Sequence, residues 1–305
     1  MNSKTVVSDS HEAPDDKDCQ QDGLVRPVIY VPPASTLATS SRAVGIVMRR
    51  ELIRFRADKI RIVTTLLQPM LYIFVIGTGL TSLTSNGSLV NLRTFIYPGA
   101  LGMSVMFTAV FSAGSIVWDR EFGFMREMLV APISRTSIVV GKGLGGTVVA
   151  SFQAIIVLSV AGMAGVPYSP ALMIELLGEA ALLAFTLTSF GILASVRVKT
   201  MQGFMGLTQM LIMPLFFTAG AMFPLSRLPA WLTVVTRVNP LAYAIDPIRR
   251  AVFSYLALPQ RVREMYAPGI TWDGWKVPTI GELLIVLLIG IALLGVAISQ
   301  FRNIE

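Results

Sequence analysis

Six long apolar stretches limit most strongly what this chain of 305 residues can fold into. They lie near residues 62–82, 97–118, 140–164, 171–195, 203–223 and 281–300. A helix needs about 20 apolar residues to cross the roughly 30 Å of hydrocarbon in a bilayer. Continuous apolar runs of this length do not alternate as the strands of a membrane barrel do. The pattern predicts an all-α integral membrane protein with six transmembrane helices.

The composition agrees with a membrane protein. Hydrophobic residues make up 53% of the chain and charged residues only 14%, whereas a soluble domain carries about 25% charged residues. This excludes an ordinary soluble enzyme and a mostly disordered protein. The net charge of +7 indicates basic loops on one side of a membrane rather than a nucleic-acid partner.

Few residues are suited to metal binding or catalysis. The single cysteine, Cys19, excludes an intramolecular disulfide and a cysteine-built metal cluster. The single histidine, His11, removes most histidine-based catalysis. We therefore expect no metal site and no cofactor bound by this chain.

The N-terminal residues 1–41 differ from the rest. They are rich in acidic residues, serine, threonine and proline, and they hold no apolar run of signal-peptide length. We interpret them as a disordered acidic cytoplasmic tail in front of a membrane domain at 42–305. Cys19 and His11 both lie in this tail.

Lysine and arginine set the expected orientation. They gather before the first span, between spans 2 and 3, between spans 4 and 5, and after span 6. The positive-inside rule then places both termini in the cytoplasm. The long segment 224–280 carries seven basic residues on the other side, but long loops follow this rule poorly.

Residues 41–61 have the pattern of an amphipathic helix. Val44, Met48, Leu52 and Phe55 repeat at helical spacing and form one apolar stripe. The helix is predicted to lie at the cytoplasmic interface with basic residues toward lipid phosphates. These are Arg49, Arg50, Arg54 and Arg56. It either anchors the chain only, or also borders a partner or a lipid entrance.

The loop between spans 2 and 3, residues 119–142, predicts a second amphipathic helix. Phe122, Met125 and Leu129 share a helical face, Pro132 ends the helix, and Ser134 is placed to cap the next one. Such a helix on the cytoplasmic side suits a groove on a soluble partner. The alternative is a helix lying flat on lipid.

The run Gly-Lys-Gly-Leu-Gly-Gly at 141–146 contains a formal G-x-G-x-x-G. It has no βαβ context, and it lacks the serine or threonine that a phosphate-binding loop needs after its lysine. We interpret these glycines as positions of close helix packing. The chain has no nucleotide-hydrolysing motif of its own.

Several polar residues lie inside the predicted spans. The candidates for lining a pathway are Gln68, Gln153, Glu175, Glu179 and Gln209. The glutamines fit interhelical hydrogen bonds equally well, and the two glutamates fit solvation near the interface. Pro69 and Pro214 predict kinks in spans 1 and 5.

The segment between spans 5 and 6 is apolar but interrupted by prolines. This predicts outer re-entrant half-helices packed against protein rather than a free aqueous loop. The residues assigned to this outer element are Pro224, Trp231, Asn239, Pro240, Asp246 and Arg249. Asp246 and Arg249 are three residues apart and are predicted to pair.

Two of these segments resemble ABC-2 type transporter permeases, most closely the daunorubicin-resistance and nodulation-factor-export permeases. The first carries Arg-Glu-Phe-Gly at 120–123, Glu-Met-Leu-Val-Ala-Pro-Ile-Ser-Arg at 127–135 and Gly-Lys at 141–142. The second carries Pro-Leu-Ser at 224–226, Leu-Pro at 228–229, Trp-Leu at 231–232 and Asn-Pro-Leu at 239–241. The resemblance covers about residues 42–300.

The resemblance implies a half-transporter in a bacterial cytoplasmic (inner) membrane. Two permease subunits, identical or paralogous, would enclose a pathway, and two separate ATPase subunits would supply the ATP and Mg chemistry. The ATPase contact would pass through a coupling helix at Glu121, Phe122, Gly123, Arg126 and Glu127. The implied function is export of a lipophilic drug, lipid or glycolipid out of the cytoplasm or inner leaflet by a subunit that is not itself an enzyme.

Two alternatives come from other classes. An ion-coupled secondary carrier would use Glu175 and Glu179 as proton sites, but no inverted repeat is evident. An integral-membrane lipid transferase would need a cluster of acids, histidine or arginine facing the membrane, and the only histidine lies in the tail.

Overall fold

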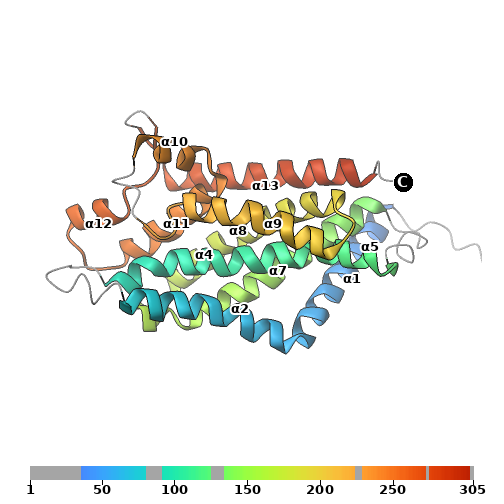
Figure 1. Ribbon diagram of the computed structural model, residues 1–305, viewed down its shortest axis with the longest axis horizontal. Coiled ribbons are helices and arrows are strands. Elements are labelled where there is room, and N and C mark those ends of the chain that lie inside the picture. The colour runs from blue at the N-terminus through green and yellow to red at the C-terminus, as the bar shows by residue number, and fades with distance from the viewer. Residues whose placement is uncertain (1–35, 80–90, 125–133, 224–228, 273–274, 303–305) are drawn as a thin grey trace, which may run out of the picture. The chain divides into compact units, whose positions relative to one another are not determined.

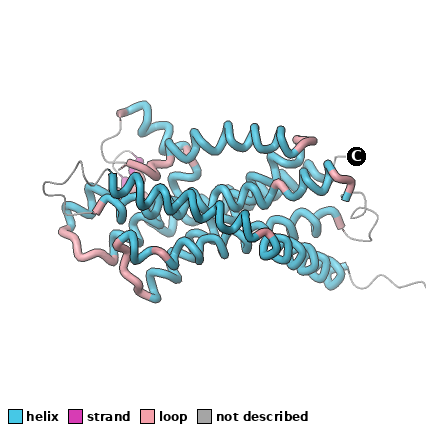
Figure 2. Tube along the Cα trace, turned by 60° about the horizontal axis from the view of Figure 1, so that its bottom comes forward, coloured by secondary structure: helices cyan, strands magenta, loops and turns pink. Residues whose placement is uncertain are grey.

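The computed structural model describes residues 36–79, 91–124, 134–223, 229–272 and 275–302 (Figure 1). These residues are almost entirely helical (Figure 2). Residues 1–35 of the predicted tail lie outside the described residues. Helix α1 (Thr36–Ala57) begins within the last residues that the sequence assigned to the tail, and it ends four residues before the predicted boundary at 61.

All six apolar stretches contain helices. They correspond to α2 (Lys59–Leu71) with the π-helix η1 (Tyr72–Ile76), α4 (Leu92–Ala113) with α5 (Ser115–Glu121), α7 (Arg135–Ser159), α8 (Pro170–Arg197), α9 (Met201–Thr218) and α13 (Thr279–Arg302). Among the described residues, four helical segments are long and apolar enough to cross a membrane: Leu92–Glu121, Arg135–Ser159, Pro170–Arg197 and Thr279–Phe301. The structure is that of an all-α membrane protein with four candidate spans.

Helix α4 is the central element of the core. Nearly all of its side chains are buried. It packs against α7 and α8, which also pack against each other, and α13 packs against α8 and α7. The hydroxyl of Tyr97 donates to the Val157 carbonyl at 3.2 Å. The hydroxyl of Thr94 donates to the Ala164 carbonyl at 2.7 Å, in the short 3-10 helix η2 (Ala161–Ala164). These two hydroxyl groups of α4 are therefore paired with backbone acceptors of α7 and η2.

The helix boundaries follow from capping residues. Ser134 accepts from the Ser137 N–H at the start of α7, so the predicted cap is confirmed. Thr200 caps α9 by accepting from the Gly203 N–H. At α11 (Pro240–Ser254), Asn239 accepts from the Leu241 N–H and Pro240 takes the first helical position, where a missing N–H costs nothing.

The two prolines predicted to kink spans lie inside helices. Pro69 is in α2, and the α-helix changes to the π-helix η1 three residues later. Pro214 lies inside α9. A proline removes one hydrogen bond of the helix. A π-helical turn is another local irregularity within an α-helix, and here the two lie close together in α2–η1.

The segment after α9 folds into short elements. They are α10 (Ala230–Val238), α11, α12 (Gln260–Tyr266) and a two-stranded antiparallel sheet of β1 (Thr271–Trp272) and β2 (Trp275–Lys276). Helix α11 is largely buried and packs against α4, α8 and α13. The indole of Trp272 donates to the Tyr243 hydroxyl at 2.9 Å, which ties the sheet to α11.

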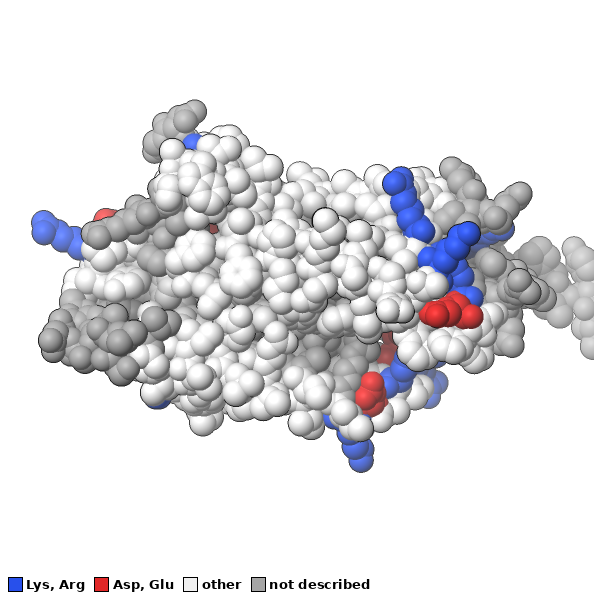
Figure 3. Space-filling view, in the orientation of Figure 1, with Lys and Arg blue, Asp and Glu red and all other residues white. Residues whose placement is uncertain are grey.

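The helices share two ends, which we name by the elements found there. At the α5 end, Ile116 of α5, Val139 of α7, Val196 of α8 and Phe301 of α13 form one apolar cluster. At the opposite α10 end lie α10, α12 and the start of α13 (Figure 1). On the face shown in Figure 3, charged side chains gather at the α5 end and the long middle is uncharged. This separation matches what a bilayer demands of a spanning bundle.

Candidate functional site

Five charged side chains meet at the α5 end, and we call them the α1 ion cluster: Arg50, Glu51, Arg54, Asp119 and Lys142. Lys142 of α7 is almost fully buried, with its Nζ 2.6 Å from Asp119 Oδ2 and 3.1 Å from Glu51 Oε1. Arg50 lies 2.6 Å from the same Asp119 oxygen. Arg54 lies 3.4 Å from the other Asp119 oxygen. The cluster joins α1, α5 and α7.

Small residues allow α1 to approach α7 closely enough for these contacts. A Cβ on Gly141 would lie 2.8 Å from Val47 Cβ, and one on Gly145 would lie 3.1 Å from Glu51 Cβ. The two glycines are one turn apart on the face of α7 that meets α1. A Cβ on Gly146 would lie 2.7 Å from Thr188 Cγ2 on α8. The predicted role of these glycines in close packing is confirmed at these three positions.

Three consecutive residues at the end of α5 contact four other helices, and we call them the α5 junction: Asp119, Arg120 and Glu121. Asp119 belongs to the α1 ion cluster and so contacts α1 and α7. Arg120 Nη1 donates to three carbonyls at the end of α8, Ser195, Val196 and Val198, at 3.1–3.3 Å. Glu121 Oε2 accepts from the Met201 N–H at 2.8 Å, at the start of α9.

The chain turns away immediately after the α5 junction. Phe122 ends α5, and Gly123 adopts a φ of +83°, a conformation that glycine reaches without steric cost. The exposed ring of Phe122 stacks on Trp118 with centroids 4.7 Å apart. Of the predicted coupling residues, Glu121, Phe122 and Gly123 are therefore placed at this turn. Arg126 and Glu127, with most of the predicted helix, lie outside the described residues.

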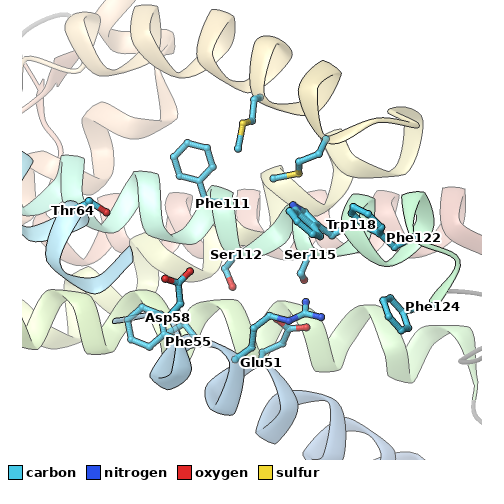
Figure 4. Close-up of a pocket in the computed structure, with 14 residues that line it drawn as sticks. Glu51, Phe55, Asp58, Thr64, Phe111, Ser112, Ser115, Trp118, Phe122 and Phe124 are labelled. Atoms are coloured by element: carbon cyan, nitrogen blue, oxygen red, sulfur yellow. The ribbon is translucent and has the colours of Figure 1, made fainter. Parts of the chain in front are cut away.

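A pocket of about 650 Å³ lies beside the α1 ion cluster, between α1, α2, α4, α5, α7 and α9. Figure 4 shows the residues that line it. The polar side chains come from Glu51, Arg54, Asp58, Thr64, Ser112 and Ser115. Phe111, Trp118, Phe122, Met201 and Met205 supply apolar surface, and Phe55 lies beside Asp58. An amphipathic lining of this kind suits a molecule with one polar end and one apolar body.

A second group of charges, the α11 ion cluster, lies at the α10 end: Asp246, Arg250 and Glu282. Arg250 Nε is 2.9 Å from Asp246 Oδ2, and its Nη2 is 2.5 Å from Glu282 Oε2. The same guanidinium donates to the Val277 carbonyl. Both carboxylates are fully buried, so Arg250 ties α11 to the start of α13.

The predicted pairing of Asp246 with Arg249 differs from the observed contacts. Asp246 is one helical turn from Arg250 and pairs with it. Arg249 is fully buried on the other side of α11, where it donates to the Gly220 carbonyl and lies over the Phe95 ring at 4.9 Å. A spacing of four brings side chains onto one helix face as well as a spacing of three does, so spacing alone did not identify the partner.

The structure describes some of the remaining residues of the predicted outer element. Asn239 donates to the Leu215 carbonyl at 2.6 Å and to the Thr218 hydroxyl at 2.9 Å, which ties the start of α11 to the end of α9. Trp231 of α10 is 68% exposed. Pro224 lies outside the described residues.

None of the five candidates for lining a pathway lines the pocket. Gln153 is fully buried and donates to the Ser104 hydroxyl at 3.2 Å. Glu179 is 6% exposed, while Glu175, one turn earlier on α8, is exposed. Gln68 is half-buried on α2, and Gln209 is exposed on α9. Of these, Gln153 fits the interhelical hydrogen bond that the sequence left open.

The basic residues of α1 separate into two groups. Arg49 and Arg56 are exposed, while Arg50 and Arg54 reach Asp119. Sequence reasoning missed Glu51, Asp119 and Lys142 as a functional group. The available signal was that Asp119 and Lys142 sit at the ends of long apolar helices, where a charge requires a partner.

A bundle of apolar helices with ion pairs near both ends defines a multi-pass helical membrane protein. A family model described as ABC-2 type transporter matches residues 42–253. The chain belongs to this family. It is therefore the permease component of an ABC-2 exporter, works with ATPase subunits and is not itself an enzyme.

Three curated relatives illustrate the similarity. The putative transport permease ycf38 of Cyanophora paradoxa is 29% identical over 209 residues, 67% of this chain and 72% of the relative. The probable multidrug ABC transporter permease YbhR of Escherichia coli K12 is 29% identical over 164 residues, 50% of this chain and 42% of the relative. Nodulation protein J of Rhizobium leguminosarum bv. viciae is 27% identical over 190 residues, 62% of this chain and 73% of the relative.

Proposed function

We propose that this permease exports a lipophilic drug, lipid or glycolipid, and that ATPase motion reaches it through the α5 junction. The single observation that carries the second part is the set of contacts made by Asp119, Arg120 and Glu121, which join four helices. A displacement of the segment after Gly123 acts directly on these contacts. A rigid connection of this kind passes a movement at the surface into the bundle.

The proposed complex contains two copies of this permease, or one copy and a paralogue, with two ATPase subunits at the α5 end. The α5 end is then the cytoplasmic side of a bacterial inner membrane, with both termini there. The charged residues gathered at this end support that orientation (Figure 3). The α2–η1 helix and α9 complete six spans, and α10 and α11 form the outer re-entrant element.

The class of cargo is inferred from the pocket and from the relatives. The pocket combines aromatic and methionine side chains with polar ones, as expected for an amphiphile. One relative bears the name of a probable multidrug permease. Membership of the ABC-2 family favours ATP-driven export over an ion-coupled carrier or a lipid transferase.

The test of coupling uses substitutions at Glu121 in the permease coexpressed with its partner ATPase. Glu121→Arg reverses the charge and removes the acceptor for the Met201 N–H, so we expect loss of ATPase copurification and of ATP-dependent export. Glu121→Gln keeps an acceptor oxygen at the same place and separates the loss of that bond from the loss of charge.

The matched control is Glu264→Arg on α12, an exposed glutamate at the α10 end. This variant should copurify with the ATPase as the wild type does. Normal export and normal ATPase copurification by Glu121→Arg would refute the proposed coupling route.

A further inference from the structure

The α1 ion cluster has more positive than negative groups. It contains three cationic side chains, Arg50, Arg54 and Lys142, against two carboxylates, Glu51 and Asp119. The whole group therefore carries a net charge of +1. A charge inside or beside a bilayer is costly unless it is paired. The side chain that carries the excess positive charge is therefore a candidate to bind an anion.

The contact distances assign the excess positive charge of the α1 ion cluster to Arg54. Arg50 and Lys142 each reach Asp119 at 2.6 Å, whereas Arg54 reaches it at 3.4 Å. The Arg54 side chain is 47% exposed, while that of Lys142 is 1% exposed. Among the described residues that line the pocket, Arg54 is the only one with a cationic side chain.

The pocket lining also holds two carboxylates. Glu51 is buried and is held by Lys142 at 3.1 Å. Asp58, at the junction of α1 and α2, also takes part in an interaction. Ser112 and Ser115 line the same pocket (Figure 4), and the Ser115 hydroxyl accepts from Lys142 Nζ at 2.9 Å. A guanidinium with hydroxyl groups nearby is suited to bind a phosphate, sulfate or carboxylate group.

The apolar part of the pocket lining is suited to an apolar body. Phe111, Trp118 and Phe122 supply aromatic surface from α4 and the α5 region, and Met201 and Met205 supply adaptable side chains from α9. We propose that this pocket binds an anionic amphiphile, with the acidic group at Arg54 and the apolar part against Trp118, Met201 and Met205. The ligand is either a membrane phospholipid or the exported cargo. Only the second of these sources rests on the proposed export function.

Fluorescence quenching tests the binding. The probes are phosphatidylglycerol and phosphatidylcholine with identical brominated acyl chains, titrated into the full-length protein in detergent. Bromine quenches tryptophan at close range, and the difference between wild type and Trp118→Phe isolates the signal of the pocket. We expect this signal to be quenched at a lower concentration of phosphatidylglycerol than of phosphatidylcholine.

Two substitutions on α1 test the role of Arg54. Arg54→Gln should raise the half-quenching concentration of phosphatidylglycerol about tenfold and leave phosphatidylcholine unchanged, because one charge-assisted contact is lost. Arg42→Gln makes the same change at an exposed position of α1 outside the pocket and should alter neither lipid. Equal quenching by both lipids, no effect of Arg54→Gln, or an unchanged signal in Trp118→Phe would each overturn the proposal.

A second measurement separates the two sources of the ligand. In proteoliposomes with the partner ATPase, movement of labelled phosphatidylglycerol between leaflets on addition of ATP identifies it as cargo, whereas stable binding without movement identifies a resident phospholipid. Both results retain the site. Failure of ATPase copurification would instead refute the proposed function and leave the quenching result intact.

Discussion

At the scale of single residues, Asp119 is the position on which most contacts of the α5 end depend. It is 1% exposed and accepts from three cationic side chains. Removing its charge leaves a net charge of +2 in the α1 ion cluster. Removing the charge of Lys142 instead leaves Arg50 and Arg54 to balance Glu51 and Asp119, a neutral group. The two residues are therefore not equivalent partners.

We predict that Asp119→Asn destabilises the protein more than Lys142→Met. Breaking a buried ion pair by removing one partner costs about 3–5 kcal/mol, and this loss should apply fully to Asp119→Asn. Lys142→Met replaces a buried charge with a side chain of similar length and should cost less. Thermal unfolding in detergent measures both, and a larger loss for Lys142→Met would contradict this account of the cluster.

The ion pairs of the α1 ion cluster could not be predicted from the sequence. The stripe along residues 41–61 and the arginines on another face were visible in the sequence. Glu51 and Lys142 are 91 positions apart, and Arg50 and Asp119 are 69 apart. Helical periodicity gives the face on which a residue lies but not the helix that this face meets. The pairs were therefore absent from the sequence-based site.

At the scale of elements, the approach of α7 to α1 depends on two glycines one turn apart. Gly141 has no room for a Cβ beside Val47. Gly143, two residues later, would place its Cβ 3.4 Å from Ile192 Cδ1, an ordinary contact. The same substitution at these two positions therefore separates helix propensity from helix packing.

We predict opposite results for Gly141→Ala and Gly143→Ala. Both gain about 1 kcal/mol of helix propensity. Gly143→Ala should be neutral or stabilising, while Gly141→Ala should push α1 away and lower the unfolding temperature. Limited proteolysis at the exposed α1–α2 junction provides a second measurement, because a displaced α1 should loosen the helical backbone there and speed cleavage. Equal stability of the two variants would show that α1 does not depend on this contact.

The position of α11 depends on Arg250. We predict that Arg250→Gln destabilises the protein strongly, because Asp246 and Glu282 remain buried without their cation. The double variant Arg250→Gln with Glu282→Gln removes one of these carboxylates and should recover part of the loss. Unfolding temperatures of the single and double variants measure this. An additive or greater loss in the double variant would count against Arg250 as the tie between α11 and α13.

At the scale of the whole molecule, the proposed topology places the α5 end in the cytoplasm and the α10 end outside. The only cysteine is Cys19, so a Cys19→Ser background accepts single reporter cysteines. Lys199 and Arg261 are exposed at the α8–α9 connection and on α12. A membrane-impermeant maleimide should label Arg261→Cys in intact cells and label Lys199→Cys only after permeabilisation. The reverse pattern would invert the topology.

The positions of the long helices along the chain were the part of the fold that the sequence predicts best. Runs of about 20 apolar residues have few ways to satisfy their backbone groups in a bilayer, and all six predicted stretches contain helices. The capping role of Ser134 and the packing role of the glycines in α7 could be predicted from local rules. The short strands β1 and β2 were not predicted. The pocket was not predicted either, because its lining comes from distant segments of the chain.

The difference in apolar length among the helices has a consequence for biogenesis. Four helical segments are long and apolar enough to cross a membrane, whereas the helix Leu66–Gly79 is shorter and α9 is not among the four. The fully buried side chains of α9 form one stripe, Phe204, Thr208, Ile212 and Phe216. In the six-span arrangement, the four apolar helices partition into lipid by themselves, and α2 and α9 follow by assembling on them. Insertion of α2 and α9 then depends on the packed core, so a defect in the packing of α4 against α8 impairs insertion as well as folding.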